Sequence, residues 1–240
     1  MYSSKRKLLF AAMTMALSLT GTAHAEGLNG TVGIGASFQN SDAEPFGSNV
    51  AADADFPGAF DSGDGIVGVL GVGHDLAGPF RIEGRLSFHQ ADFNSRRYGT
   101  GARNGAEYIL DGDIESTSLT IDGFYDIPTN GAFSPYVKGG IGVSSNRYSA
   151  RLGGAGVAEF DAFDGTSDGY YDAYADRDST EFAWNIGLGG SFALNDRITL
   201  FGEYQYASFG DGSTGQDYFT DGFRVDSTAH EVLLGLRSQF

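Results

Sequence analysis

The chain has 240 residues, no cysteine, and 31 acidic against 15 basic residues, which gives a formal net charge of −16. This balance argues against a nucleic-acid partner, which would need a basic face, and disulfides cannot hold the fold. Glycine is abundant at 37 residues and aromatic residues make up 13%, a composition that indicates β structure rather than disorder.

The first predicted element is a secretory signal peptide over residues 1–25. A basic start at residues 5–7 precedes an apolar stretch from Leu8 to Leu19, which is too short to span a bilayer as a helix, and Ala23-His24-Ala25 is the cleavage site. Cleavage removes three basic residues and no acidic ones, so the formal charge becomes −19. Residues 26–240 are then expected to form one exported domain without a helical anchor.

Eight β-strands follow, because apolar and polar residues alternate with period 2 in most apolar segments and no long helical period is present. In the clearest segment, Phe80, Ile82 and Leu86 lie on one face, and Arg81 and Glu83 lie on the other. The second strand alternates poorly, so its facing stays open. The predicted strands span residues 28–39, 64–74, 80–90, 114–126, 133–146, 181–194, 198–209 and 228–240.

Short and long connections alternate strictly between these strands. Three are short (75–79, 127–132 and 195–197), and four are long (about 40–63, 91–113, 147–180 and 210–227). Transmembrane β-barrels have this rhythm, with short periplasmic turns and longer external loops. The pattern predicts an all-β fold, a single up-and-down antiparallel barrel of about eight strands in the outer membrane of a Gram-negative bacterium. The long external loops hold most of the excess acid, for example Asp53, Asp55, Asp61, Asp64, Asp161, Asp164, Asp168, Asp172, Asp176 and Asp178.

The apolar face is expected to meet lipid. A soluble barrel such as a lipocalin would point this face inward, but a narrow interior would not easily accept so many large side chains. Aromatic residues also gather toward both ends of the face, as in a lipid-facing band, although aromatic residues favour strands in general. The predicted girdles are Phe38, Phe88, Phe182, Trp184, Tyr204 and Tyr206 at the outer end and Phe80, Tyr125, Phe192 and Phe240 at the inner end.

Charged residues recur on the opposite, inward face at similar distances from the periplasmic turns. Buried charges are tolerated only when they are paired and hydrogen-bonded, so three acids and three bases are expected to form a closed ion-pair network. The network is either a polar plug or gate across the lumen, or simply the filling of a narrow barrel. Its predicted members are Glu83, Arg85, Asp122, Lys138, Glu203 and Arg237.

Four segments carry a family resemblance: Ser134–Val143, Phe182–Gly190, Glu203–Tyr206 and Val232–Phe240. In this order they resemble the fifth to eighth strands of the OmpA-like/porin-family outer-membrane β-barrel domain. Gln205 stands where the family usually has Arg, and Ser238 where an aromatic residue is common. The resemblance implies the barrel fold but no single function, since the family includes structural proteins, surface antigens, adhesins and small channels. It also implies an insertion signal for the barrel-assembly machinery, formed by Leu234, Leu236 and Phe240.

No catalytic, cofactor or metal site is predicted, because the histidines are few and scattered. One enzymatic alternative is a lipid A-modifying enzyme. Thr228 and His230 have the i, i+2 spacing of the deacylase His-x-Ser pair on the lipid-facing parity, but Thr replaces Ser and no acidic partner is evident on that face.

The main expectation is therefore a monomeric structural or surface-interaction protein that displays acidic external loops. A narrow channel is the alternative, because small lumenal residues can leave a water path: Gly140, Gly142, Gly187 and Gly189. The expected partners are outer-membrane lipid and lipopolysaccharide, the barrel-assembly machinery, and divalent cations at the acidic loops.

Overall fold

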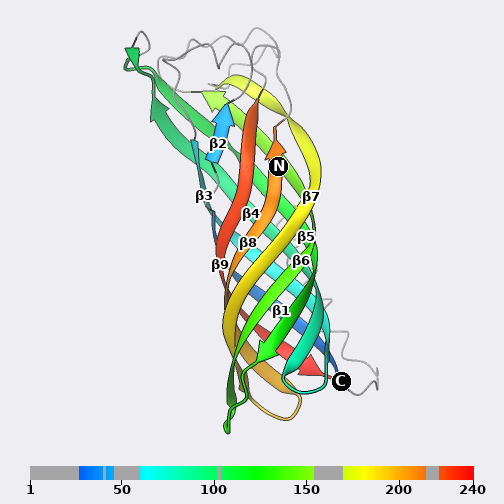
Figure 1. Cartoon of the computed structure of the whole chain (residues 1–240). Helices are drawn as coiled ribbons and strands as arrows, with labels where there is room; N and C mark the ends of the chain where they lie inside the picture. Colours follow the sequence, from blue (N-terminus) through cyan, green and yellow to red (C-terminus); the bar gives the residue numbers. More distant parts are fainter. Residues whose placement is uncertain (1–26, 40–41, 46–59, 102–103, 154–169, 215–221) are drawn as a thin grey trace.

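The computed structural model describes residues 27–39, 42–45, 60–101, 104–153, 170–214 and 222–240. They form one antiparallel sheet that is wound into a tall barrel (Figure 1). In these ranges no helix is long and apolar enough to cross a membrane. The strands are β1 (Leu28–Gln39), β2 (Asp42–Pro45), β3 (Phe60–Asp75), β4 (Phe80–Tyr98), β5 (Glu107–Asp126), β6 (Phe133–Gly153), β7 (Tyr170–Ala193), β8 (Ile198–Ser213) and β9 (Phe223–Gln239).

The sheet closes on itself through eight strands. β1 pairs with both β3 and β9, and from β3 to β9 each strand pairs with the next one in the chain. The short strand β2 pairs with β3 and β9 beyond the end of β1, so it takes the place of β1 at the loop end of the barrel. The predicted eight-stranded up-and-down barrel is confirmed, and β2 is an addition that the sequence reading missed.

The strands are strongly staggered. Asn29 of β1 pairs directly with Gln239 of β9. Following the paired residues the other way around the barrel, through Glu83 of β4 and Asn185 of β7, leads to Ala229 instead. Gln239 and Ala229 are ten positions apart, and a stagger of this kind requires strands that tilt against the barrel axis. Figure 1 shows this tilt. Residues at equal distances from their turns therefore lie at different heights.

Apolar side chains face outward and charged side chains face inward around the turn-side half. Ile141 is 63% exposed, whereas Glu83 and Asp122 are buried. Monomeric soluble proteins rarely expose a continuous apolar surface of this kind, and an outer-membrane barrel covers it with lipid. The facing of the second predicted strand is now settled, because Val67 and Val69 point into the lumen.

The predicted girdle residues all lie on the outward face. Phe88 and Tyr206 are partly covered by neighbours, and the others are exposed. Rings from adjacent strands touch at both ends, with centroids 5.4 Å apart for Phe80 and Tyr125 and 5.6 Å apart for Trp184 and Tyr206. The three residues assigned to the insertion signal are exposed on the outward face: Leu234, Leu236 and Phe240. Their role in assembly stays a prediction.

Several strands extend further toward the loops than the sequence pattern predicts. β4 continues to Tyr98, β5 begins at Glu107, β6 ends at Gly153 and β9 begins at Phe223. The predicted loops 91–113, 147–180 and 210–227 are therefore wrong over much of their length. Beyond the lipid the outer face of a strand meets water and becomes polar, so the contrast between apolar and polar faces fades. The signal peptide and much of the acidic loop sequence lie outside the described residues, including Asp53, Asp55, Asp161, Asp164 and Asp168.

Candidate functional site

A charged layer crosses the lumen in its turn-side half, and Glu203 lies at its centre. Arg85 donates from Nη1 to Glu203 Oε1 at 2.6 Å, and Lys138 donates from Nζ to the same oxygen at 3.1 Å. The Tyr136 hydroxyl donates to Glu203 Oε2 at 2.9 Å. These side chains come from three different strands, and all are buried. The barrel closure therefore brings together groups that are far apart in the sequence.

Two further acids complete the layer. Lys138 donates to Asp122 Oδ2 at 2.8 Å, and Arg85 Nε donates to Glu83 Oε1 at 3.0 Å. Asn185 also donates to Asp122 Oδ1 at 3.2 Å. Five of the six charges named from the sequence thus meet in one place, and each carboxylate accepts more than one hydrogen bond or ion pair. Such pairing is what lets charges remain buried.

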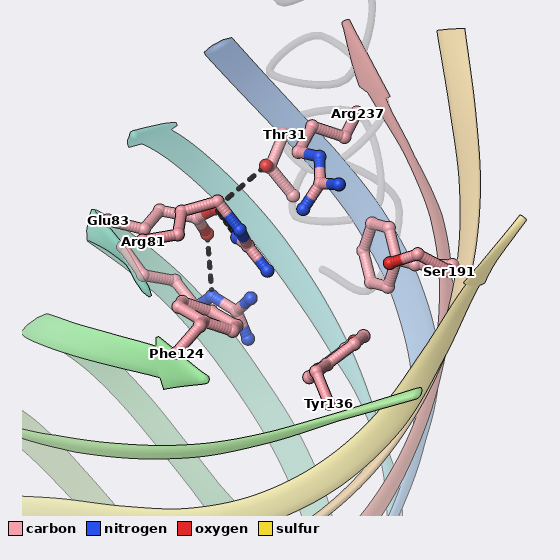
Figure 2. Close-up of a pocket in the computed structure, with 9 residues that line it drawn as sticks. Thr31, Arg81, Glu83, Phe124, Tyr136, Ser191 and Arg237 are labelled. Atoms are coloured by element: carbon pink, nitrogen blue, oxygen red, sulfur yellow. Dashed lines mark hydrogen bonds and ion pairs between the residues drawn. The ribbon is translucent and has the colours of Figure 1, made fainter. Parts of the chain in front are cut away.

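The sixth charge, Arg237, does not join this network. Glu203 pairs in register with Leu233, four positions before Arg237, so Arg237 lies nearer the turn end than Glu203. Arg81 takes the place in the network that was assigned to Arg237 (Figure 2). Nη1 of Arg81 lies 3.3 Å from Glu83 Oε2, and Nε of Arg81 lies 3.5 Å from Asp126 Oδ2. Among the described residues Arg237 makes no direct ion pair with the charged layer, although Asp126, Asp75 and Glu83 attract it. Counting residues from the turns does not show this difference, because it ignores the stagger of the strands.

A second buried polar cluster lies nearer the loops and was not foreseen. His89 Nδ1 is 2.7 Å from Glu231 Oε1, and Ser37 donates to the same oxygen at 3.2 Å. Gln205, the residue that stands where the resembled family usually has Arg, donates to the other oxygen of Glu231. The His89 ring packs on Phe209, with centroids 4.4 Å apart. The inward parity of His89 and Glu231 was visible in the sequence, but their contact depends on barrel closure.

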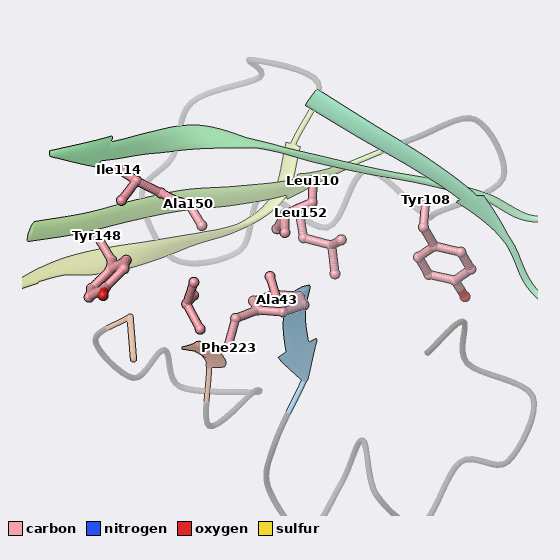
Figure 3. Close-up of a cluster of buried hydrophobic side chains, with 9 residues drawn as sticks. Ala43, Tyr108, Leu110, Ile114, Tyr148, Ala150, Leu152 and Phe223 are labelled. Carbon is pink, nitrogen blue, oxygen red and sulfur yellow. The ribbon is translucent and has the colours of Figure 1, made fainter. Parts of the chain in front are cut away.

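An apolar cluster fills the loop end of the lumen, and we call it the apolar cap (Figure 3). β5 and β6 supply its residues on one side of the barrel, and β2 and β9 supply them on the other. The hydroxyl of Tyr148, itself a member of the cap, is hydrogen-bonded to the Ser227 hydroxyl across the lumen at 3.0 Å. The cap consists of Ala43, Tyr108, Leu110, Ile114, Tyr148, Ala150, Leu152, Phe223 and Val225. Most of these residues fall in predicted loops, although Tyr148, Ala150 and Leu152 keep period 2.

Neighbouring atoms lie too close to the lumenal glycines for a side chain to fit at these positions. A Cβ atom added at Gly140 would overlap the Asp122 carboxylate and the Asn185 amide. One added at Gly189 would overlap the ring and hydroxyl of Tyr136. Gly142 and Gly187 are similarly crowded by the neighbouring strands. The space that these glycines leave is therefore occupied.

The enzymatic alternative rested on Thr228 and His230. His230 Nδ1 is hydrogen-bonded to the Tyr204 hydroxyl at 2.7 Å, and its ring packs beside Tyr206 on the outward face. In the part of the chain that the structure describes, the hydrogen-bond partner of His230 is a tyrosine hydroxyl and not a carboxylate. The arrangement therefore resembles an aromatic girdle more than a nucleophile with its base. That the protein is not an enzyme remains a prediction.

Comparisons with known proteins agree with this architecture. The family model of the outer membrane protein beta-barrel domain matches residues 9–237. Outer membrane protein PagN of Salmonella typhimurium is 24% identical over 188 residues, which cover 72% of each chain.

Two solved structures have a similar fold. OprG of Pseudomonas aeruginosa has a TM-score of 0.51 at 18% identity, covering 91% of this chain and 99% of its own. The outer membrane protease OmpT of Escherichia coli has a TM-score of 0.52 at 10% identity, covering 93% of this chain and 100% of its own. At such low sequence identity, structural similarity to these two proteins is evidence for the fold alone. With the family match over nearly its whole length, the chain belongs to the outer membrane protein β-barrel domain family and is an integral protein of the Gram-negative outer membrane.

Proposed function

We propose that the protein is a closed, membrane-embedded scaffold that acts through the surface it holds outside the lipid. The observation that carries this proposal is the filled lumen. The charged layer around Glu203, the polar cluster around Glu231 and the apolar cap occupy successive heights of the barrel. An eight-stranded barrel has an interior only wide enough for side chains, so these layers favour a scaffold over a channel.

The wall beyond the lipid supports a role in surface interaction. A transmembrane strand needs about 9–11 residues, whereas β6 has 21 and β7 has 24. The outward face of this wall carries paired charges of both signs: Arg151 and Asp111 are 2.6 Å apart, and Arg96 and Glu107 are 2.8 Å apart. The apolar cap gives the wall a core of its own. It therefore offers a partner a pre-ordered surface, which reduces the entropy lost on binding.

Conductance measurements test the closed lumen. Refolded residues 26–240 in a planar bilayer are expected to stay silent, because ions would have to cross both the charged layer and the apolar cap. Heat-modifiable gel mobility, measured on the same sample, confirms that the barrel has refolded. Discrete openings of the wild-type protein would contradict the proposal and restore the narrow channel. Openings that appear only in Glu203→Gln would identify the charged layer as the seal.

We also propose that lipopolysaccharide is the lipid partner, bridged by divalent cations to the acidic external segments. In vesicles with lipopolysaccharide in the outer leaflet, millimolar Mg²⁺ is expected to raise the thermal midpoint by about 2–4 °C, since a ligand that binds only the folded state stabilises it. Phosphatidylglycerol vesicles with the same Mg²⁺ are the control for surface charge. An equal rise in both membranes would remove lipopolysaccharide as a specific partner.

A further inference from the structure

Four aromatic rings and one histidine gather on the outward face at the outer end of the lipid-facing band. They come from β1, β7, β8 and β9, which are neighbours in the closed sheet. On β8 and β9 the next outward residues toward the loops carry hydroxyl groups, Ser208 and Thr228. The gathering therefore lies where the apolar face ends. We call it the outer platform, and its members are Phe38, Trp184, Tyr204, Tyr206 and His230.

The outer platform is confined to one side of the barrel. On β3, β5 and β6 the apolar run of the outward face ends in an aliphatic residue, and on β4 it ends in one ring. These residues are Ile66, Leu119, Val143 and Phe88. A girdle that only anchors a barrel at the interface is expected around its whole circumference. The one-sided gathering therefore favours recognition of a particular molecule.

His230 is held by two neighbours on β8. Its Nδ1 is hydrogen-bonded to the Tyr204 hydroxyl at 2.7 Å, and these two rings are stacked, with centroids 6.0 Å apart and 19° between their planes. The Tyr206 ring lies 5.0 Å from the His230 ring and 5.6 Å from the Trp184 ring. The four rings thus form one ordered surface. When the Tyr204 hydroxyl donates to Nδ1, Nε2 carries the ring proton and can donate it to a ligand.

This chemistry fits a lipid headgroup that has both sugar rings and phosphates. Tyr204 and Trp184 are 43% and 38% exposed, so their rings are accessible from the lipid side. The negative face of an aromatic ring attracts the C–H groups of a sugar ring. A phosphate accepts hydrogen bonds from the imidazole and from tyrosine hydroxyls, and bonds to a charged acceptor are the strong ones.

We propose that the outer platform binds the phosphorylated sugar headgroup of lipopolysaccharide. This inference rests on the proposed function, because it takes lipopolysaccharide as the lipid partner, and it adds a site that needs no divalent cation. The acyl chains of the bound lipid follow the aliphatic residues on the turn side of the platform, such as Ile186 and Val232. A glycerophospholipid supplies a phosphate but no sugar ring, so it binds less well.

Thermal unfolding in EDTA tests this site, because EDTA removes the cation bridges to the acidic segments. Refolded residues 26–240 are placed in phosphatidylcholine vesicles that contain either lipopolysaccharide or an equal charge of phosphatidylglycerol. Lipopolysaccharide is expected to raise the midpoint by about 2–4 °C over phosphatidylglycerol. His230→Ala should lose this difference, and Tyr204→Phe, which keeps the ring but removes the hydroxyl, should reduce it. His74→Ala truncates an exposed histidine at the turn end of β3 and should retain it.

Trp184 supplies a local readout, since it is the single tryptophan of the chain. Lipopolysaccharide should shield it from acrylamide quenching more than phosphatidylglycerol does, and His230→Ala should lose the extra shielding. A change in barrel stability alone would not produce this effect. The His230 variant should still gain stability from Mg²⁺ in lipopolysaccharide, because the acidic segments are unchanged.

Two results would overturn the outer platform. One is equal midpoints and equal shielding in the two lipids in EDTA. The other is a lipopolysaccharide effect that persists undiminished in both His230→Ala and Tyr204→Phe. Neither result decides whether Mg²⁺ bridges lipopolysaccharide to the acidic segments, since that rise is measured without EDTA. Conversely, a rise in EDTA without any further rise in Mg²⁺ would support the platform and contradict the cation bridge.

Discussion

Replacing Glu203 with glutamine is expected to lower the free energy of unfolding by about 3–5 kcal/mol, the usual cost of removing one partner from a buried ion pair. The amide keeps the shape of the side chain but removes its charge. Arg85 and Lys138, both buried, would then share only the remaining carboxylates Glu83 and Asp122. Urea unfolding followed by fluorescence measures the change, because the chain has a single tryptophan, Trp184.

Two variants control this prediction. Tyr136→Phe removes only the neutral hydrogen-bond donor of Glu203 and should cost about 1 kcal/mol. The double variant Glu203→Gln with Lys138→Gln should cost less than the sum of the two single changes, since each single change removes one of the other charge's partners. A Glu203→Gln protein as stable as the wild type would show that the layer does not depend on this carboxylate.

Phe223→Ala is expected to open the wall outside the lipid while the membrane part stays folded. Phe223 is almost fully buried in the apolar cap, and removing a buried phenylalanine side chain costs about 3–5 kcal/mol. The cap joins β2 and β9 to β5 and β6, so its loss should expose the loop-side ends of these four strands. Hydrogen exchange measured by mass spectrometry should show faster exchange there, with protection around Glu203 unchanged.

Phe182→Ala is the matched control for this change. Phe182 is 62% exposed on the outward face, so the same truncation leaves no internal cavity. Hydrogen exchange at the loop-side ends of the four strands should be the same in the Phe182→Ala variant as in the wild type. If Phe223→Ala also leaves exchange at those ends unchanged, then the cap does not hold the external wall together. If protection is lost through the whole barrel, the cap and the membrane part unfold as one unit.

Local pattern was enough to establish the class of fold and its orientation to lipid. Period-2 alternation depends only on neighbouring residues, so it assigns Ile82 and Glu83 to opposite faces without knowledge of their partners. The rhythm of short and long connections implied an even number of strands, and the barrel closes through eight. The inward charges were also identifiable, because polar groups on that face cannot meet lipid.

The height of each side chain along the barrel axis depends on how the sheet closes, so only the tertiary structure determines it. The stagger of ten positions moves Arg237 toward the turns and away from Glu203. The same closure brings His89 to Glu231 and joins the apolar cap across the lumen. These contacts link residues from distant strands, and their geometry depends on strand number and tilt together. Neither quantity can be derived from the sequence of one strand. The sequence of a strand therefore predicts which face each residue occupies but not which residues of other strands it contacts.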